Sequence, residues 1–424
     1  MQRIRRWRWV LAALLAAVGL TGTAQAWRPS GWTWWELPWV YDVASDEWHW
    51  FSPDDTQWIF TQPPGSGWNL LPQSEIANGW SFWQGDWAFD NEAGTWCWRN
   101  TVDLQWCVNI GTAHWSLFGQ TTAEGEYLVV DVSGGPAATT YPVKYLASVP
   151  PGGWTDAYKS TKLVMRVVSA GTFLMGSPHG ELGQGSDETP HPVTLTQNFY
   201  MGVFEVTQRQ WELVMGTRPS FFTNAMFYAT RPVEQVSYFD IRENPGNRAC
   251  VPNWPQSAQV HADSFMGRLQ AKTGLPCFDL PTEAQWEYAC RAGTATALNS
   301  GTNLTGLEVC PNMSDVGRYW YNGGLGASAA SAPSEGTARA GSYLPNTLGL
   351  YDMHGNVWEI CRDWYGAYPA GVQEPPGALE GLNRVLRGGG WYNSAWQCRS
   401  ASRSALLPNE RINAIGFRVA MPLP

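Results

Sequence analysis

The chain has 424 residues, a formal net charge of −9 and eight cysteines. This length favours two or three domains. No basic run occurs after residue 26, and nucleic-acid phosphates are bound by clustered Lys and Arg. We therefore exclude nucleic acid as the expected partner. The 27 tryptophans are distributed unevenly, and this distribution divides the chain.

Residues 1–26 have the pattern of a secretory signal peptide. Four arginines precede an apolar run from Trp9 to Leu20, and Ala24-Gln25-Ala26 provides a cleavage site. The apolar run is shorter than the about 20 residues that span a bilayer, so no transmembrane segment is predicted. Cleavage removes four positive charges and no acids, which changes the net charge from −9 to −13. We expect an exported protein (periplasmic, cell-surface or secreted), in which disulfides are favoured.

Residues 27–118 are predicted to form a small all-β, Trp-rich repeat domain. The tryptophans of 39–58 recur in 87–106, 48 residues later, and a fixed period of this size indicates duplicated units. Trp-x-Trp alternation places both rings on one face of a strand. We expect two β-meanders packed through their indoles, although an aromatic surface for sugars is an alternative. Cys97 and Cys107 lie on successive predicted strands, where a disulfide is plausible.

The sequence changes character after a small, polar linker at 119–125. Residues 126–133 are predicted to form a buried strand, and residues 163–177 two short strands around a Ser-Ala-Gly turn. Long glycine-rich segments follow. The domain 126–424 is therefore predicted to belong to the α+β class, with little regular secondary structure.

Helices are few but have clear ends. Thr207 and Thr282 are each followed three residues later by glutamine, which is the pattern of a capping box. Gly216 and Gly293 are expected to end these two helices. A third helix is predicted from about Ser257 to Lys272.

Six sequence blocks between residues 165 and 420 occur in the order found in a known family. The blocks are MRVVSAGTFLMGS (165–177), FYMGVFEVTQRQW (199–211), RPVEQVSYFD (231–240), FDLPTEAQWEYACRAG (278–293), LPNTLGLYDMHGNVWEICRDWYG (344–366) and RVLRGGGW…RSASR…IGFRVA (384–420). In series they resemble the formylglycine-generating enzyme, or sulfatase-modifying factor, superfamily. The resemblance implies a variant of the C-type-lectin fold.

Active members of that family oxidise a sulfatase cysteine to formylglycine with copper and oxygen, through two cysteines five residues apart. The resemblance places these positions at Asn393 and Cys398, or, counted back from the Gly-Phe-Arg block, at Gly390 and Ala395. Cu(I) is soft and selects thiolates. Neither of these two alignments supplies two cysteines. We expect the oxidase chemistry to be absent; Cys398 is catalytic only if the enzyme alternative holds. The resemblance also implies a structural disulfide between Cys290 and Cys398.

The resemblance implies one structural calcium ion. Its positions correspond to the side chains of Asp352 and Glu359 and to the backbone carbonyls of Gly355 and Val357. Oxygen donors in a glycine-bent loop suit a hard cation. The alternative is that the two carboxylates only cap local turns.

The last segment resembles that of variable proteins of diversity-generating retroelements, a branch of the same family. The fixed positions that frame the variable segment of those proteins are intact here, among them Trp391 and Gly416-Phe417-Arg418. The residues between them include Tyr, Ser and Asn, which supply adaptable contacts to a ligand. We therefore predict a non-catalytic domain that binds a protein or glycan ligand. The alternatives are an ordinary solvated loop and, for the whole chain, a formylglycine-generating oxidase. The predicted ligand-binding residues are Tyr392, Asn393, Ser394, Trp396, Gln397, Ser402, Ser404, Asn409, Glu410 and Asn413.

Overall fold

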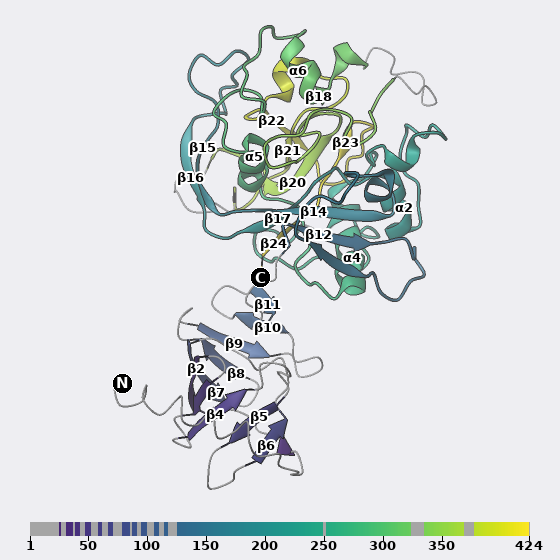
Figure 1. Ribbon diagram of the computed structural model, residues 1–424. Coiled ribbons are helices and arrows are strands. Elements are labelled where there is room, and N and C mark those ends of the chain that lie inside the picture. The colour runs from purple at the N-terminus through teal and green to yellow at the C-terminus, as the bar shows by residue number, and fades with distance from the viewer. Residues whose placement is uncertain are drawn as a thin grey trace. The chain divides into compact units, whose positions relative to one another are not determined.

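The structure of the chain is a computed structural model (Figure 1). It describes residues 125–248, 252–323, 335–368 and 377–423, and, between residues 25 and 117, the backbone of eleven strands. The chain divides into two compact units, Met1–Ala123 (together with Pro424) and Glu124–Leu423. Apart from Gln25–Ala26, the predicted signal peptide lies outside the described residues.

The N-terminal unit contains one open sheet, in the order β1-β6-β5-β4-β3-β2-β7-β8-β9-β10-β11. Antiparallel pairing of β2 with β7 joins a meander β2–β6 to a meander β7–β11. The first four strands of the two meanders begin 48 residues apart, as the repeat in the sequence requires, and β6 and β11 begin 47 residues apart. The strands are β1 (Gln25–Ala26), β2 (Gly31–Glu36), β3 (Trp39–Asp42), β4 (Glu47–Phe51), β5 (Trp58–Thr61), β6 (Gly67–Leu70), β7 (Gly79–Gln84), β8 (Trp87–Asp90), β9 (Thr95–Arg99), β10 (Trp106–Asn109) and β11 (His114–Leu117).

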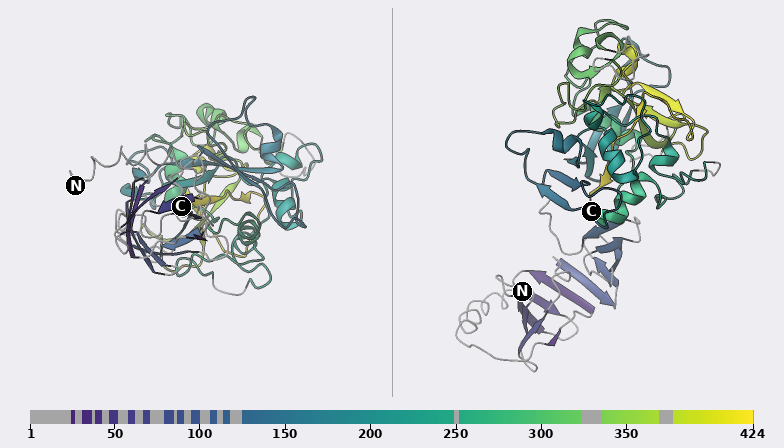
Figure 2. Two further views of the ribbon diagram at one scale, coloured as in Figure 1. Left: turned by 60° about the horizontal axis from the view of Figure 1, so that its bottom comes forward. Right: turned by 90° about the vertical axis from the view of Figure 1, so that its right-hand side faces the viewer.

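The C-terminal unit is built on a five-stranded antiparallel sheet, in the order β13-β12-β14-β17-β24. The last strand, β24, pairs with β17 and forms one edge of the sheet (Figures 1 and 2). The predicted strands in 126–133 and 163–177 are confirmed as β12, β14 and β15. The bounds are β12 (Tyr127–Asp131), β13 (Val143–Leu146), β14 (Lys162–Val168), β15 (Gly171–Met175), β17 (Phe199–Gly202) and β24 (Ala420–Pro422).

A second, four-stranded sheet in the order β22-β21-β20-β23 carries the last two sequence blocks. Two small pairs, β15 with β16 and β18 with β19, complete the strands among the described residues of this unit. The remaining bounds are β16 (His191–Leu195), β18 (Gly317–Arg318), β19 (His354–Gly355), β20 (Trp358–Trp364), β21 (Arg384–Arg387), β22 (Arg403–Leu406) and β23 (Ile415–Gly416). Few helices and several short sheets confirm the α+β class.

Two of the three predicted helices begin as predicted; α2 (Gln208–Met215) ends at the predicted Gly216, whereas Ala292 and not Gly293 caps α5 (Glu283–Arg291). The capping boxes of Thr207 and Thr282 are both present, since each threonine hydroxyl satisfies a free N–H of the first turn. The third helix begins later than predicted, after the cap Ser264, because residues 257–261 are irregular and residues 262–263 form a turn. The helices are α2 (Gln208–Met215), α3 (Tyr238–Ile241), α4 (Phe265–Thr273), α5 (Glu283–Arg291) and α6 (Pro311–Val316), with short 3-10 turns η3 (Asp156–Lys159), η4 (Tyr228–Thr230), η5 (Trp320–Asn322) and η6 (Ala395–Cys398).

Packing of aromatic rings holds the helices in place. Trp211 of α2 stacks on Phe265 of α4 with ring centroids 5.4 Å apart, and Phe417 meets Phe265 edge-on at 5.1 Å. Trp286 of α5 is fully buried. None of the helices in the described part of the chain is both long and apolar enough to cross a membrane.

Candidate functional site

The segment after β21 contains the positions of the predicted thiol pair. Gly388 and Gly389 have φ of +91° and +80°, a region that favours glycine. A Cβ on Gly389 would lie 2.5 Å from Cys398 Sγ, so Cys398 packs directly against this glycine. Asn393 is buried, and its Oδ1 accepts from the backbone N–H of Gly390 at 2.9 Å. Asn393 therefore closes a turn.

Cys398 is a buried thiol without an ionised neighbour. Burial raises the pKa of its thiol well above the usual range, because a thiolate loses its hydration there. Burial also raises the pKa of Cys290 to about 12. The other position of the predicted pair, Asn393, supplies an amide and no thiol. This arrangement does not bring a thiolate pair to the turn.

His354 fixes the backbone under Cys398. Its Nδ1 lies 2.7 Å from the carbonyl oxygen of Cys398, and its Nε2 accepts from the N–H of Asn299 at 3.0 Å. This pattern requires a neutral ring with the proton on Nδ1. Burial lowers the pKa of His354 to about 4, in agreement with that state. The histidine therefore has a structural role: it holds the backbone of Cys398 beside that of Asn299.

The disulfide that the resemblance implied is absent from the structure, in which Cys290 and Cys398 are free and buried. Instead, Cys290 Sγ donates to Ser400 Oγ at 3.6 Å and to the Met353 carbonyl at 3.7 Å. Cys310 and Cys361 are also free.

Cys97 and Cys107 lie on the neighbouring strands β9 and β10. The register pairs Cys97 with Asn109 and Cys107 with Arg99, so the cysteines are two positions apart across the ladder. Their side chains lie outside the described residues, and their disulfide stays a prediction.

The two carboxylates predicted for calcium have different surroundings. Both oxygens of Glu359 are occupied: the Arg418 guanidinium donates to them at 2.5 and 2.6 Å, and Trp286 Nε1 donates at 2.7 Å. Asp352 accepts from the N–H of Gly341 through Oδ2, while its buried Oδ1 has no partner. Burial raises the pKa of Asp352 to about 6.

One of the two carboxylates predicted to bind Ca²⁺ is already paired in this arrangement, and the other has an oxygen without a partner. Glu359 is committed to a buried ion pair with Arg418, and Gly355 and Val357 contribute only backbone. No three His, Cys, Asp or Glu side chains within the described ranges are placed to share a metal ion. Calcium stays a prediction, and no functional step below depends on it.

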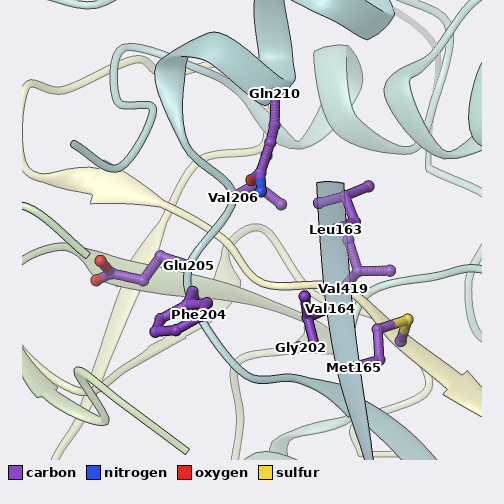
Figure 3. Close-up of a pocket in the computed structure, with 9 residues that line it drawn as sticks. All are labelled: Leu163, Val164, Met165, Gly202, Phe204, Glu205, Val206, Gln210 and Val419. Atoms are coloured by element: carbon purple, nitrogen blue, oxygen red, sulfur yellow. The ribbon is translucent and has the colours of Figure 1, made fainter. Parts of the chain in front are cut away.

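A small, mainly apolar cavity lies between β14, β17 and α2 (Figure 3). Glu205 is its one ionisable lining residue. The carboxylate accepts from Asn356 Nδ2 at 2.6 Å and from the N–H of Val357 at 3.2 Å, and Figure 3 shows it turned away from Leu163 and Gln210. Burial and the charge of Asp352 raise the pKa of Glu205 well above its usual range. The carboxylate supports the loop 352–357 and offers no reactive group to the cavity.

The predicted ligand-binding residues separate into three groups by exposure. Tyr392, Trp396, Asn409 and Glu410 are exposed, and Ser394, Gln397, Ser404 and Asn413 are half-buried. Asn393 and Ser402 are buried, which removes both from the predicted surface.

The predicted surface also extends over separate parts of the fold. Trp391 Nε1 donates to the Asn413 carbonyl at 2.9 Å, so Tyr392 and Asn413 flank one buried ring. Ser404 instead lies on β22, paired with Leu386.

The structure adds residues that the sequence pattern missed. Leu307 accepts from the N–H of Trp396 at 3.0 Å, and the Glu308 carbonyl accepts from Trp320 Nε1 at 3.2 Å. The Glu308 carboxylate also bonds the Ser394 hydroxyl. Leu307, Trp396 and the neighbouring Tyr392 are all more than one third exposed. No motif could have indicated this contact, because the two segments are about 90 residues apart in sequence.

The buried Arg399 holds a further loop beside this turn. Arg399 is fully buried, donates to Glu181 at 2.6 Å and to both Glu188 oxygens at 2.7 and 2.8 Å, and also bonds the Gly183 carbonyl. A Cβ on Gly183 would lie 2.6 Å from the Trp396 Cβ. The loop 177–189 is therefore fixed against η6, which explains why arginine occupies position 399.

The family of sulfatase-modifying factor enzyme 1-like domains matches residues 155–423. The chain belongs to this family. The match contains every described strand of the C-terminal unit except β12 and β13, and the five α-helices described there.

Curated relatives carry different names. A formylglycine-generating enzyme of Thermomonospora curvata is 35% identical over 292 residues, which cover 60% of this chain and 92% of the relative. The chaperone protein LppX of Paenibacillus barcinonensis is 32% identical over 222 residues, covering 48% and 72%. Among solved structures, Treponema denticola variable protein 1 has 28% identity and a TM-score of 0.48, covering 63% of this chain and 97% of that chain.

Proposed function

We propose that the chain is an exported member of this family whose C-terminal unit binds a protein or glycan ligand without catalysis. The turn at 391–398 carries the proposal. Where the resemblance implies two thiolates, Asn393 is buried and bonded to the N–H of Gly390, and Cys398 is a buried, protonated thiol. An amide oxygen is a hard donor and does not replace a thiolate for Cu(I).

The same turn offers a surface suited to recognition. Tyr392 and Trp396 are 46% and 37% exposed, and each adjoins a buried neighbour that holds its backbone. Aromatic side chains on a rigid turn bind with a small loss of conformational entropy, and they suit protein or glycan partners alike. Ser394 and Gln397 add polar groups beside them.

A turnover assay tests the absence of catalysis. The purified chain is incubated with a Cys-x-Pro-x-Arg peptide, copper and oxygen, and the peptide mass is measured; a formylglycine-generating enzyme serves as the positive control. We expect no loss of the thiol mass. Formylglycine in the peptide would establish the oxidase alternative, which the relatives named formylglycine-generating enzymes favour.

Ligand binding has its own test on protein and glycan arrays. Tyr392→Ser and Trp396→Ser are each expected to raise the dissociation constant of any captured ligand at least tenfold. Tyr145→Ser on β13 is a matched control, since Tyr145 is also an exposed aromatic residue, 38% exposed, but belongs to the other sheet. Equal weakening by all three changes would contradict binding at the turn.

A further inference from the structure

The register of the N-terminal sheet places nearly all of its tryptophans on one face. Residues directly opposite each other in neighbouring strands share a face, and successive residues of one strand alternate. Trp39 pairs with Trp50, Trp50 with Phe60, and Phe60 with Trp68. The aromatic positions of β3, β4, β5 and β6 therefore form one continuous row.

The second meander continues the same face. Trp34 on β2 pairs with Trp80 on β7, and Phe82, two positions along β7, pairs with Phe89. Phe89 then pairs with Trp96. Following the pairs to β11 places every strand tryptophan on this face except Trp35 and Trp83.

The two faces differ sharply in charge. Glu36 is the one charged residue at the strand positions of the aromatic face in β2–β11. The opposite face carries Asp42, Glu47, Asp90 and Arg99 among other polar residues. A sheet with one apolar face requires a second layer over that face. The described strands of this unit form a single sheet, and none of them forms a second layer over this face.

The area of the aromatic face matches that of a protein dimer. Ten strands about 4.8 Å apart, each about four residues long at about 3.4 Å per residue, cover roughly 650 Å². The largest exposed apolar patch of a monomer is about 300–600 Å², whereas a stable interface buries about 800 Å² per partner. An almost uncharged face also meets its own copy without like-charge repulsion, unlike the opposite face.

We propose that a second copy of this chain covers the aromatic face, so that two identical sheets pack face to face as a sandwich around a two-fold axis. Such an interface is isologous, because both copies contribute the same surface, the aromatic face, to it. The function of the 48-residue repeat is then to widen the sheet until its face is large enough for association. This proposal is independent of ligand binding by the C-terminal unit.

Sedimentation velocity of the full chain, processed by its host on export, tests the dimer. We expect a species of twice the chain mass at micromolar concentration. A monomer up to 50 µM would overturn the proposal. In that case, protection of the tryptophans from iodide quenching would assign the covering layer to the same chain, and quenching changed by soluble oligosaccharides would assign it to a glycan.

Matched variants test which face is used. Trp34→Ser and Trp87→Ser change the aromatic face, and Trp35→Ser and Trp83→Ser change the opposite face of the same or neighbouring strands. The first pair is expected to raise the dimer dissociation constant at least tenfold, because buried interface tryptophans are frequent hot spots. The second pair should leave it within twofold, with far-UV circular dichroism as the folding control. Equal effects of both pairs would refute the face assignment, and the wild-type measurement decides the dimer even if a variant fails to fold.

Discussion

Replacing Asp363 by asparagine is expected to change how the stability of the C-terminal unit depends on pH. Asp363 lies on β20, is fully buried, and accepts from the N–H of Glu283 at 2.6 Å. Burial raises its pKa to about 7; the Glu283 carboxylate adds to the rise, and Arg362 and Arg384 oppose it.

The sign and size of the effect follow from the two states of this carboxyl group. In the unfolded chain it ionises near pH 4, whereas in the folded chain it keeps its proton up to about pH 7. The folded state binds more protons between these values, so its stability falls as the pH rises through this window. A pKa of about 7 instead of about 4 corresponds to about 4 kcal/mol at pH 8.

The Asp363→Asn variant keeps an acceptor for the Glu283 N–H but does not titrate. Scanning calorimetry should give similar melting temperatures for both proteins at pH 4.5. At pH 8 the variant should melt up to about 8 °C higher, at about 2 °C per kcal/mol for a unit of this size. Asp263→Asn, which changes a 71% exposed side chain, is the control and should show no such trend. The same melting difference for Asp363→Asn at both pH values would refute the reasoning.

Three further outcomes are expected at the turn. Arg399→Met should destabilise the unit by about 3–5 kcal/mol in denaturant unfolding, because it leaves the buried Glu188 charge without its cation; a loss below 1 kcal/mol would contradict the buried pair. Gly389→Ala should cost about 1–3 kcal/mol, owing to its positive φ and the adjacent Cys398 sulfur, and a neutral effect would speak against this geometry. Cys290 and Cys398 should be unreactive toward a thiol reagent in the folded chain and reactive after unfolding, whereas a disulfide between them would leave both silent.

Local structure was predictable where short-range hydrogen bonds decide it. The capping boxes of Thr207 and Thr282 involve residues three positions apart, so the sequence itself contains both partners of each bond. The family could also be recognised, because its blocks keep their order over most of the C-terminal unit. The late start of α4 was missed, since Ser264 competes with earlier residues as a cap.

The chemistry of the site could be predicted only in part. Loss of the thiol pair is visible at Asn393, but its role as a buried turn residue depends on the bond to Gly390. The partner of Glu359 is Arg418, 59 residues away, and this ion pair occupies both oxygens of one of the two carboxylates predicted to bind calcium.

The sequence by itself determined the family, the starts of the two helices with capping boxes and the 48-residue period of the tryptophans, because these are properties of neighbouring residues or of their order. Tertiary structure alone decided which frame residues are buried, which charges are neutralised and which face the tryptophans share. Trp39 and Trp68 reach one face only through two intervening strands, and Arg399 meets Glu188 across 211 residues. Burial and pairing of this kind depend on the strand register and on chain segments that meet only in the folded state.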